Sequence, residues 1–390
     1  MALPKELQDT LKAINKKYGA GTITTANKAV AVKLKRIPSG SFSLDCELGG
    51  GYPEGRITII AGPFSSGKTF LLYKAIAEGQ KKYPNKIAVF IDQEGTFDSD
   101  WAENFGIDLD RLEVVRPATA EQGFDILVGL MQSPHISVLG LDSLASMASS
   151  KEIESSMEDS EAMGGNAKMN NKFFRKAQGI LNMGSIEDEK EQPAIIIINQ
   201  LRDTMDKYKP EIMPGGRGQE FYSSITLFVR IGDRYIEKKA DGREVYVGHM
   251  VKFKTEKNKT FPPKRQGTFD IYVDDANNGF TAGQIDRLKE VVTYAIFWGV
   301  VKKSGGWYSV LGDESNKIQG AAKVLDYLRE NAEVREEVEK QVMAVALTTK
   351  KSDRGKKKGE AEPITYETED GEGYVIDPET GEVIEGPEEE

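Results

Sequence analysis

One eight-residue segment constrains this chain more than any other, because it fits the G-x-x-x-x-G-K-[ST] pattern of a phosphate-binding loop. The segment consists of Gly62, Pro63, Phe64, Ser65, Ser66, Gly67, Lys68 and Thr69. A β-rich run over residues 56–61 precedes it, and a run with helical apolar spacing over 69–77 follows it. Such a strand–loop–helix directs backbone N–H groups and a helix N-terminus towards one anion. The flanking runs argue against the alternative, a glycine-rich turn that only caps a helix.

The residue types in this loop predict a bound nucleoside triphosphate with Mg²⁺. Lys68 is expected to reach the β- and γ-phosphates, and the Thr69 hydroxyl is expected to ligate the metal. What the chain does with the nucleotide has to come from other residues.

Composition limits the class of protein. With 390 residues, the chain is long enough for one large domain with smaller additions. It has no apolar run long enough to span a membrane, and its first residues lack the apolar centre of a secretory signal. The single cysteine, Cys46, is expected to be a small buried residue and rules out an internal disulfide framework. One cysteine and two histidines cannot build a structural zinc site. These features predict a cytoplasmic protein.

The charge distribution separates a mildly basic body from an acidic tail. Residues 360–390 contain thirteen Asp or Glu residues and no Lys or Arg. The rest of the chain carries 49 acidic and 52 basic residues, although the net charge of the whole is −10. A basic linker over 350–358 lies between them. The tail is either a solvated, disordered end or a competitor of DNA phosphates for the basic surface of the body.

Alternating β-rich and helical stretches predict an α/β fold with a mostly parallel central sheet. Several β-rich runs are continuously apolar, as expected for strands covered on both faces. These runs lie over residues 56–61, 86–92, 112–116, 136–142, 194–199 and 223–231. More strongly alternating runs over 243–255 and 267–273 indicate added antiparallel strands.

Four regions are predicted along the chain. The regions are a helix and strand for self-association (1–35), the α/β core (36–275), a small C-terminal lobe (276–347), and the basic linker with a disordered acidic tail (348–390). The self-association region begins with an amphipathic helix over residues 1–18, and a short polar segment over 19–25 follows that helix. The C-terminal lobe is helical apart from a glycine-rich hairpin near 304–308.

Two acidic residues follow apolar runs downstream of the phosphate-binding loop. Asp142 ends the run 136–142, where a carboxylate can hold the Mg²⁺ shell beside the Thr69 hydroxyl. Glu94 follows the run 86–92, where it can polarise an attacking water. The structural alternatives are a simple strand end for Asp142 and a helix cap for Glu94. Their position after a phosphate-binding loop favours the hydrolytic interpretation.

Further polar residues follow the same pattern. Asp98 and Trp101 come soon after Glu94, and the Trp101 indole is a candidate for stacking on a base, although a core tryptophan fits the spacing equally well. Gln200 ends an apolar run, where a polar side chain can sense the γ-phosphate.

Two polar segments, at about 154–166 and 203–218, predict mobile loops. A helix with several basic residues follows the first of them, and Arg202 precedes the second. Mobile loops with basic neighbours suggest a polymeric anion whose binding depends on the nucleotide.

The order of these motifs resembles that of the bacterial and phage RecA-type recombinases, from the N-terminal helix to about residue 345. The motifs that carry the resemblance are Gly62–Thr69, Asp92-Gln-Glu94, Leu141-Asp-Ser143, Asn199-Gln-Leu-Arg202, Ser39–Asp45, Glu152-Ile-Glu154, Asp159-Ser160, Gly215-Gly216, Phe221-Tyr222 and Gly306-Trp-Tyr308. This set is far more specific than a phosphate-binding loop alone.

The resemblance implies roles for the matching residues. Glu94 is the implied hydrolytic glutamate, and Gln200 is implied to couple the ATP state to the second DNA loop. Lys257 and Lys259 are implied to reach the ATP phosphates of a neighbouring subunit, so that ATP lies between protomers. The implied subunit contacts are Ile23 and Phe221. The implied DNA-binding residues are Lys168, Lys172, Arg175, Arg202, Gly215, Gly216 and Arg217 for the single strand, and Lys252 and Lys254 for incoming duplex. For every lysine, the alternative is a solvated surface charge.

Four positions depart from the usual pattern of these recombinases. Glu220 stands where a basic residue is usual, and Trp101 replaces a tyrosine. Tyr272 is displaced by one residue from the second adenine-packing tyrosine, and Phe70 replaces a hydroxyl residue after Thr69. Glu220 is expected to alter a contact between subunits, whereas Trp101, Tyr272 and Phe70, together with Asp98, complete the predicted nucleotide contacts.

The predicted function is therefore a DNA-dependent ATPase that forms an ATP–Mg²⁺ filament on single-stranded DNA and exchanges strands with homologous duplex. Its predicted partners are the two DNAs and further copies of itself; a single-strand-binding protein and loader proteins are additional candidates. Two alternatives stay open: a ring helicase of the same fold, and a DNA-coating mediator that uses ATP as an assembly switch. Lys257 and Lys259 argue against the first, and Glu94 argues against the second.

Overall fold

The computed structural model describes residues 3–19, 23, 34–156, 165–184, 191–204, 211–239, 241–348, 364–367, 373–376 and 383–385. The chain divides into two compact units, and each is assembled from separate stretches of sequence. The first unit contains residues 1–37, 52–63 and 75–226, and the second contains residues 38–51, 64–74 and 227–390. The predicted region boundaries at residues 35, 275 and 347 remain predictions.

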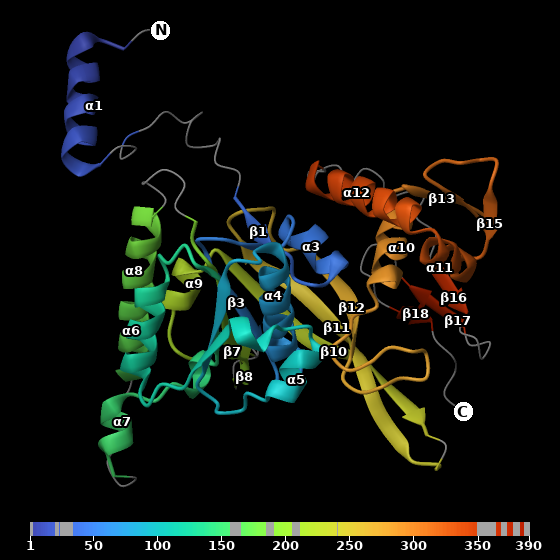
Figure 1. Ribbon diagram of the computed structural model, residues 1–390, viewed down its shortest axis with the longest axis horizontal. Coiled ribbons are helices and arrows are strands. Elements are labelled where there is room, and N and C mark those ends of the chain that lie inside the picture. Colours follow the sequence, from blue (N-terminus) through green and yellow to red (C-terminus); the bar gives the residue numbers. More distant parts are fainter. Residues whose placement is uncertain are drawn as a thin grey trace. The chain divides into compact units, whose positions relative to one another are not determined.

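Strands and helices alternate along the first unit (Figure 1). Its strands are β1 (Arg36–Ile37), β2 (Tyr52–Pro53), β3 (Ile57–Gly62), β4 (Ile87–Asp92), β5 (Leu112–Val115), β6 (Ile136–Asp142), β7 (Ala194–Gln200), β8 (Arg202–Asp203) and β9 (Glu211–Ile212). Its helices are α1 (Lys5–Tyr18), α5 (Ser99–Asn104), α6 (Ala120–Leu130), α7 (Ser150–Glu154), α8 (Gly165–Gly184) and α9 (Gly218–Tyr222), with short 3-10 turns η1 (Leu109–Arg111) and η2 (Leu144–Ser146). Helix α4 (Lys68–Lys82) and strand β10 (Ile225–Lys238) each have residues in both units.

Five strands of the first unit form a parallel sheet in the order β3-β7-β6-β4-β5. Strands β3 and β6 are buried throughout, and β7 is buried up to its last residue. Such strands need cover on both faces, which explains their continuous apolar runs. The predicted α/β fold with a mostly parallel sheet is confirmed. The carboxyl ends of the strands meet at one edge, where Gly62 lies in register with Gln200 and Asp92 with Asp142.

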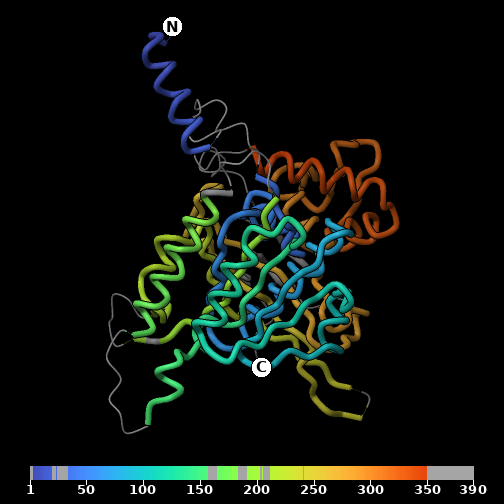
Figure 2. The backbone as a smooth tube through the Cα atoms, turned by 60° about the vertical axis from the view of Figure 1, so that its left-hand side comes forward, coloured from blue at the N-terminus to red at the C-terminus, as the bar shows by residue number. Residues whose placement is uncertain are grey.

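Helices α6 and α8 lie side by side in the first unit (Figures 1 and 2). The stacked rings of Phe124 on α6 and Phe173 on α8 have their centroids 4.3 Å apart. The packed face of α8 is therefore apolar, and its exposed residues include Lys168, Lys172 and Arg175.

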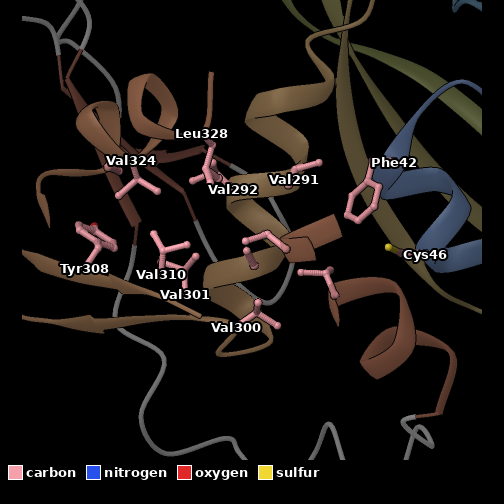
Figure 3. Packing of buried hydrophobic residues seen from close by; sticks show 14 of the residues in the cluster. Phe42, Cys46, Val291, Val292, Val300, Val301, Tyr308, Val310, Val324 and Leu328 are labelled. Carbon is pink, nitrogen blue, oxygen red and sulfur yellow. The ribbon is translucent and has the colours of Figure 1, made fainter. Parts of the chain in front are cut away.

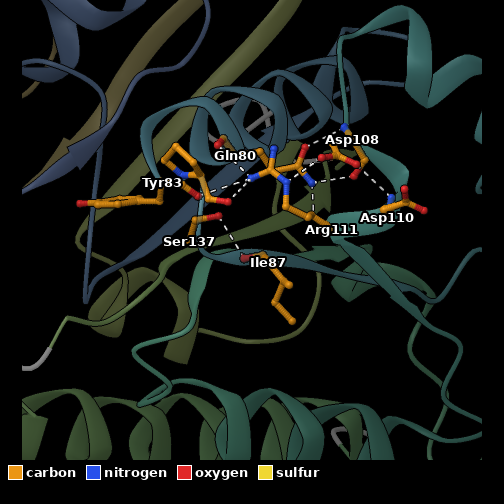
Figure 4. A network of polar contacts seen from close by, with 8 residues as sticks. Gln80, Tyr83, Ile87, Asp108, Asp110, Arg111 and Ser137 are labelled. Atoms are coloured by element: carbon orange, nitrogen blue, oxygen red, sulfur yellow. Dashed lines mark hydrogen bonds and ion pairs between the residues drawn. The ribbon is translucent and has the colours of Figure 1, made fainter.

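A polar network holds the carboxyl-terminal end of α4 in the first unit (Figure 4). The Arg111 guanidinium donates to the carbonyl oxygens of Gln80 and Pro84, each at 3.1 Å. Gln80 lies in the last turn of α4, where the carbonyl groups have no intrahelical partners. The buried Gln80 side chain in turn donates to the carbonyl oxygens of Asp108 and Arg111 and accepts from the Asp108 N–H. This end of the helix is thereby fixed to the segment that precedes β5.

The second unit contains a sheet in the order β10-β11-β12, with β11 at Glu244–Asn258 and β12 at Gln266–Tyr272. Strands β10 and β11 are the longest in the described chain, with 14 and 15 residues, and form the long yellow ribbon in Figure 1. Strands β11 and β12 are antiparallel, with Lys252 opposite Thr268 and Lys254 opposite Gln266. The predicted antiparallel strands are confirmed.

An apolar core in the second unit lies among four helices and a small sheet (Figure 3). The helices are α3 (Phe42–Leu48), α10 (Arg287–Phe297), α11 (Ala321–Glu330) and α12 (Ala332–Thr348), and the strands are β13 (Val301–Ser304), β14 (Trp307–Val310) and β15 (Lys317–Gln319). The predicted hairpin near 304–308 is confirmed, because Ser304 pairs with Trp307. The third strand was not predicted, since three residues are too few to show alternation. The predicted burial of Cys46 is confirmed in this core.

A buried carboxylate from α10 holds the amino-terminal end of α3. Glu290 Oε2 accepts from the Ser43 N–H at 2.7 Å and from Ser41 Oγ at 3.0 Å. Ser41 is also the N-cap of α3, where its side chain accepts from the Leu44 N–H. Burial raises the pKa of Glu290 to about 8. Glu290 therefore joins two segments of the second unit that are far apart in sequence.

The acidic tail contains three short strands, β16 (Ile364–Glu367), β17 (Gly373–Ile376) and β18 (Val383–Glu385), which pair as an antiparallel sheet. The prediction of a disordered tail is corrected at these residues. The strands are rich in Ile, Val, Tyr and Thr, which favour β-structure, and glycine and proline lie between them. The charge count gave no weight to these residues. The basic linker over 350–358 lies outside the described residues.

Candidate functional site

The phosphate-binding loop, which joins β3 to α4, has a backbone suited to an anion. Ser65 and Gly67 have positive φ angles of 58° and 86°, and such turns gather backbone N–H groups into a concave nest. A Cβ at Gly67 would lie 3.3 Å from Val251 Cγ2 and 3.4 Å from Ile271 Cδ1, so a larger residue has little room. Helix α4 begins at Lys68 and adds its positive end. The loop therefore fits a triphosphate group.

The loop side chains differ in exposure. Phe64 is 91% exposed, whereas Ser66 and Lys68 are buried. Thr69 and Pro63 are half-buried. Phe70 is buried, so that its ring is committed to the packing of α4 in the second unit.

The edge of the parallel sheet collects polar residues in the first unit. The carbonyl oxygen of Asp142 accepts from the backbone N–H groups of Gln93 (2.8 Å) and Glu94 (3.3 Å). The two acids that the sequence analysis singled out therefore lie on neighbouring strand ends. Asp142 is buried, whereas Glu94 is exposed. This places one carboxylate inside the sheet edge and the other at the surface.

Asp92 organises the turn that presents Glu94, a role that sequence reasoning missed. Its carboxylate accepts from the backbone N–H groups of Thr96 and Phe97, each at 3.1 Å. The Arg116 guanidinium also donates to it, at 3.2 Å. The signal was present in the motif Asp92-Gln-Glu94, but only the second acid was given a role.

Three donors surround one oxygen of the Glu94 carboxylate. Ser143 Oγ donates to Oε1 at 2.7 Å, Ser146 Oγ lies at 3.0 Å, and Gln200 Nε2 lies at 3.3 Å. The structure thus brings together Glu94 and Gln200, which the sequence analysis placed on separate runs. The two serine hydroxyls were not predicted as part of the site.

Asn199 and Gln219 fix one side of the second predicted loop to the end of β7. The buried Asn199 side chain donates to the Pro214 carbonyl oxygen (3.1 Å) and to Gln219 Oε1 (2.6 Å). Gln219 Nε2 donates to the carbonyl oxygens of Pro214 (2.7 Å) and Gly216 (3.1 Å). The paired strands β8 and β9 lie at the start of this loop and within it. The loop is therefore anchored directly beside Gln200.

The same loop touches the basic helix α8. Asn170 on α8 donates to the Gly215 carbonyl oxygen at 3.1 Å. Gly215 and Gly216 have positive φ angles of 97° and 84°, and a Cβ on Gly216 would lie 3.0 Å from Ala167 Cβ. The exposed residues Lys168, Lys172 and Arg175 follow on this helix, and Arg202 and Arg217 are exposed at the two ends of the loop. The predicted single-strand contacts therefore gather on neighbouring elements of the first unit.

Comparison with known proteins decides the family. Residues 5–278 match the RecA N-terminal domain family, and residues 289–347 match the RecA C-terminal domain family. The chain belongs to the RecA family. Its function is therefore that of a recombinase in DNA recombination and repair.

Individual RecA proteins are similar to this chain over most of their length. The chromosomal RecA of Lactococcus lactis subsp. lactis (strain IL1403) is 35% identical over 341 residues, which cover 87% of this chain and 83% of the relative. The RecA of Thermus aquaticus is 36% identical over 342 residues, which cover 87% and 94%. The RecA of Streptococcus pneumoniae (strain Hungary19A-6) is 35% identical over 341 residues, which cover 87% and 82%.

The three residues predicted to contact adenine in this RecA-family chain have different surroundings. Asp98 is the N-cap of α5 and accepts from the Trp101 N–H at 2.8 Å. The half-buried Trp101 ring meets Phe105 edge-on, with centroids 5.4 Å apart. Tyr272 stacks on Phe280 with centroids 4.4 Å apart, so one of its faces is occupied. Burial raises the pKa of Tyr272 to about 12. All three adenine roles stay predictions.

The predicted inter-subunit lysines flank a fixed turn in the second unit. Asn258 lies between Lys257 and Lys259 and is buried. Its Oδ1 accepts from the backbone N–H groups of Thr260 (2.8 Å) and Phe261 (2.9 Å). The turn therefore has a defined backbone that sets where the two lysines leave it.

Lys252 and Lys254 lie two residues apart on β11 and share one face of the ribbon. Lys252 is half-buried, and Lys254 is exposed and pairs with Glu256 at 3.2 Å. The role of this face in contacting duplex DNA stays a prediction.

The predicted self-association residues lie at the surface of the first unit. No residue of α1 is buried. Ile23 is 37% exposed. The Asn15 side chain accepts a hydrogen bond from the Ile23 N–H (2.8 Å) and donates one to the Ile23 carbonyl oxygen (3.0 Å). Phe221 is 64% exposed on α9, where Glu220 is exposed as well.

Parts of the predicted segments lie outside the described residues. These parts are 20–22 and 24–25 near Ile23, 157–164 in the first predicted loop and 205–210 in the second. The helices that the structure describes include none that is long and apolar enough to cross a membrane.

Proposed function

We propose that this RecA-family chain is a single-stranded-DNA-dependent ATPase that assembles as a filament on the single strand and exchanges it with homologous duplex. The observation that carries the proposal is the hydrogen bond that Gln200 donates to Glu94 at the sheet edge. It joins the proposed hydrolytic residue to the neighbour of Asn199, the residue at which the second loop is anchored. Nucleotide state and DNA binding thereby share one hydrogen-bonded group.

The residues divide the nucleotide chemistry among them. Lys68 and the loop amides would bind the phosphates of ATP, and Thr69 with Asp142 would hold Mg²⁺. When bound, Mg²⁺ supplies charge neutralisation at the phosphates. Glu94 would orient a water and accept its proton. Lys257 and Lys259 would contact the nucleotide of the next subunit, so that ATP binding and assembly support each other.

Bases would be recognised by base pairing, and the protein would hold the backbones. Basic residues on α8 and around the second loop would bind the phosphates of the single strand. The affinity of the protein for the single strand would therefore depend on the salt concentration. The face of β11 with Lys252 and Lys254 would receive the incoming duplex.

DNA-stimulated ATP hydrolysis together with strand exchange tests this function. Circular single strands and homologous linear duplex are mixed with the protein, ATP and Mg²⁺, and joint molecules and phosphate release are measured. We expect both, with hydrolysis dependent on the single strand. ATP-driven unwinding of a tailed duplex without strand exchange would instead support a ring helicase. Assembly and pairing without any hydrolysis would support an ATP-switched mediator.

Replacing both Lys252 and Lys254 by alanine is expected to weaken capture of the second DNA. Loss of two phosphate contacts should lower the slope of log affinity against log salt by about 2. The measurement is binding of labelled duplex by preformed ATP filaments at several salt concentrations. The paired control is Lys302→Ala with Lys323→Ala, two exposed lysines of the C-terminal lobe. An equal loss in the control pair would contradict a specific role for the β11 face.

The variant Phe221→Ala is expected to assemble poorly without DNA. An exposed aromatic side chain at the centre of an interface commonly contributes about 2 kcal/mol or more. Sedimentation velocity with ATP should therefore show shorter assemblies. Leu347→Ala removes an apolar side chain that is 41% exposed on α12 and serves as the control. Unchanged sedimentation of Phe221→Ala would remove this residue from the interface.

A further inference from the structure

The Glu94 carboxylate is held asymmetrically. Its Oε1 has three donors within 3.3 Å, which come from the end of β6, from η2 and from the end of β7. Among the described residues, no hydrogen bond reaches Oε2. An exposed glutamate has three rotatable side-chain bonds, and holding one oxygen in place directs the other. The oxygen left over is the one that can accept a proton from water.

The two serines owe their joint position to the turn that follows β6. Residues three apart in a 3-10 turn lie above one another, and the Ser146 N–H donates to the Ser143 carbonyl oxygen at 3.3 Å. Their hydroxyl oxygens are 2.9 Å apart. Each hydroxyl has one proton, so Ser146 either donates to Glu94 directly or donates to Ser143, which donates to Glu94. In both arrangements, removing the Ser146 hydroxyl takes one donor from this group.

We infer that Ser146 is a positioning residue for hydrolysis, which together with Ser143 and Gln200 holds Glu94 Oε1 so that Oε2 faces the reacting water. This inference rests on the proposed role of Glu94. Ser146 is exposed, and among the residues that the structure describes its hydroxyl bonds only to Glu94 and Ser143. Its side chain therefore has no part in the core, and its removal should leave the fold intact.

The variant Ser146→Ala is expected to lower kcat for DNA-stimulated ATP hydrolysis roughly 3- to 10-fold, the size of effect expected when a general base is less well oriented. The KM for ATP and binding of the single strand should not change, because the inferred role of Ser146 is to orient Glu94 and not to bind either ligand. Ser146→Thr keeps the hydroxyl and should retain most of the activity. The measurement is phosphate release at saturating single-stranded DNA over a range of ATP concentrations.

Ser150→Ala is the matched control. Ser150 Oγ also donates to a glutamate carboxylate, that of Glu121, at 3.1 Å, and it lies four residues further along the chain. Its removal should leave kcat unchanged. Normal turnover in Ser146→Ala, a Thr variant as slow as the Ala variant, or an equal loss in Ser150→Ala would overturn the inference.

A double substitution separates this inference from the function on which it rests. In the Glu94→Gln background, Ser146→Ala should have no further effect on the residual rate, because it acts through that carboxylate. A further loss there would assign Ser146 a different role and overturn the inference. Normal turnover in Glu94→Gln alone would overturn the proposed role of Glu94 itself. Slow Glu94→Gln with normal Ser146→Ala would overturn only the role of Ser146.

Discussion

Replacement of Glu94 by glutamine is expected to remove nearly all ATP hydrolysis while ATP and single-stranded DNA still bind. The amide can keep the hydrogen bonds that Oε1 accepts from Ser143, Ser146 and Gln200, but it cannot accept a proton from water. A lost general base typically lowers the rate by about 10²- to 10⁴-fold. The variant should therefore form filaments that persist, because turnover no longer releases them.

Phosphate release measures the expected loss of hydrolysis, and filament lifetime measures the expected persistence of the filaments. Glu103→Gln is the matched control, since Glu103 is an exposed acid on α5 of the same unit. The control should hydrolyse ATP normally. Turnover by Glu94→Gln at the rate of the unsubstituted protein would show that another group activates the water.

The variant Glu290→Gln is expected to be more stable than the unsubstituted protein above neutral pH. Burial raises the pKa of Glu290 to about 8 from an ordinary value near 4.5, with the nearby Asp270 carboxylate acting in the same direction. The Ser43 N–H, the Ser41 hydroxyl and the Arg287 guanidinium oppose the shift. The folded state therefore keeps a proton at Glu290 that the unfolded chain releases.

The sign of the effect follows from this difference. The contribution of Glu290 to the free energy of unfolding is fully present below about pH 4.5 and is lost as the pH rises through about 8. Each pKa unit of difference corresponds to about 1.4 kcal/mol, so the total loss is on the order of a few kcal/mol. Glutamine does not titrate, and its carbonyl oxygen can accept from Ser41 and Ser43 as Oε2 does.

Chemical unfolding at pH 5 and pH 8.5 measures this prediction. The stability advantage of Glu290→Gln should be small at the lower pH and large at the higher one. Glu330→Gln on α11 removes an exposed carboxyl group and should change neither value. The same pH dependence in Glu290→Gln and the unsubstituted protein would show that other groups cause it.

The sequence predicts the nucleotide-binding part of the site well, because its chemistry lies in short local patterns. The phosphate-binding loop is one continuous segment, and Asp142 and Glu94 each follow an apolar strand. Parallel strands end at a common edge, so two acids after two such strands are expected at the same edge of the sheet. Their close approach depends also on the pairing of β4 with β6. Gln200 ends a third strand at the same edge, which is why its contact with Glu94 follows from the fold.

The rest of the site depends on contacts that no local pattern encodes. Ser146 reaches Glu94 over 52 positions, and Asn199 reaches Gln219 over 20 positions. Serine and glutamine occur in many surface turns, so neither position stands out in a single sequence. The strands of the acidic tail were missed for another reason, since their charges hid the β-forming residues between them.

The bond between Ser41 and Glu290 also has a consequence for synthesis of the protein on the ribosome. The two residues are 249 positions apart, and the same unit takes its pieces from residues 38–51, 64–74 and 227–390. At about 5–20 residues per second, ribosomes need roughly 12–50 s to extend the chain from Ser41 to Glu290. During that time the nascent α3 lacks the carboxylate that holds its first turn, and its apolar residues have not met the core of α10, α11 and α12. Those apolar residues are therefore candidates for chaperone binding during translation.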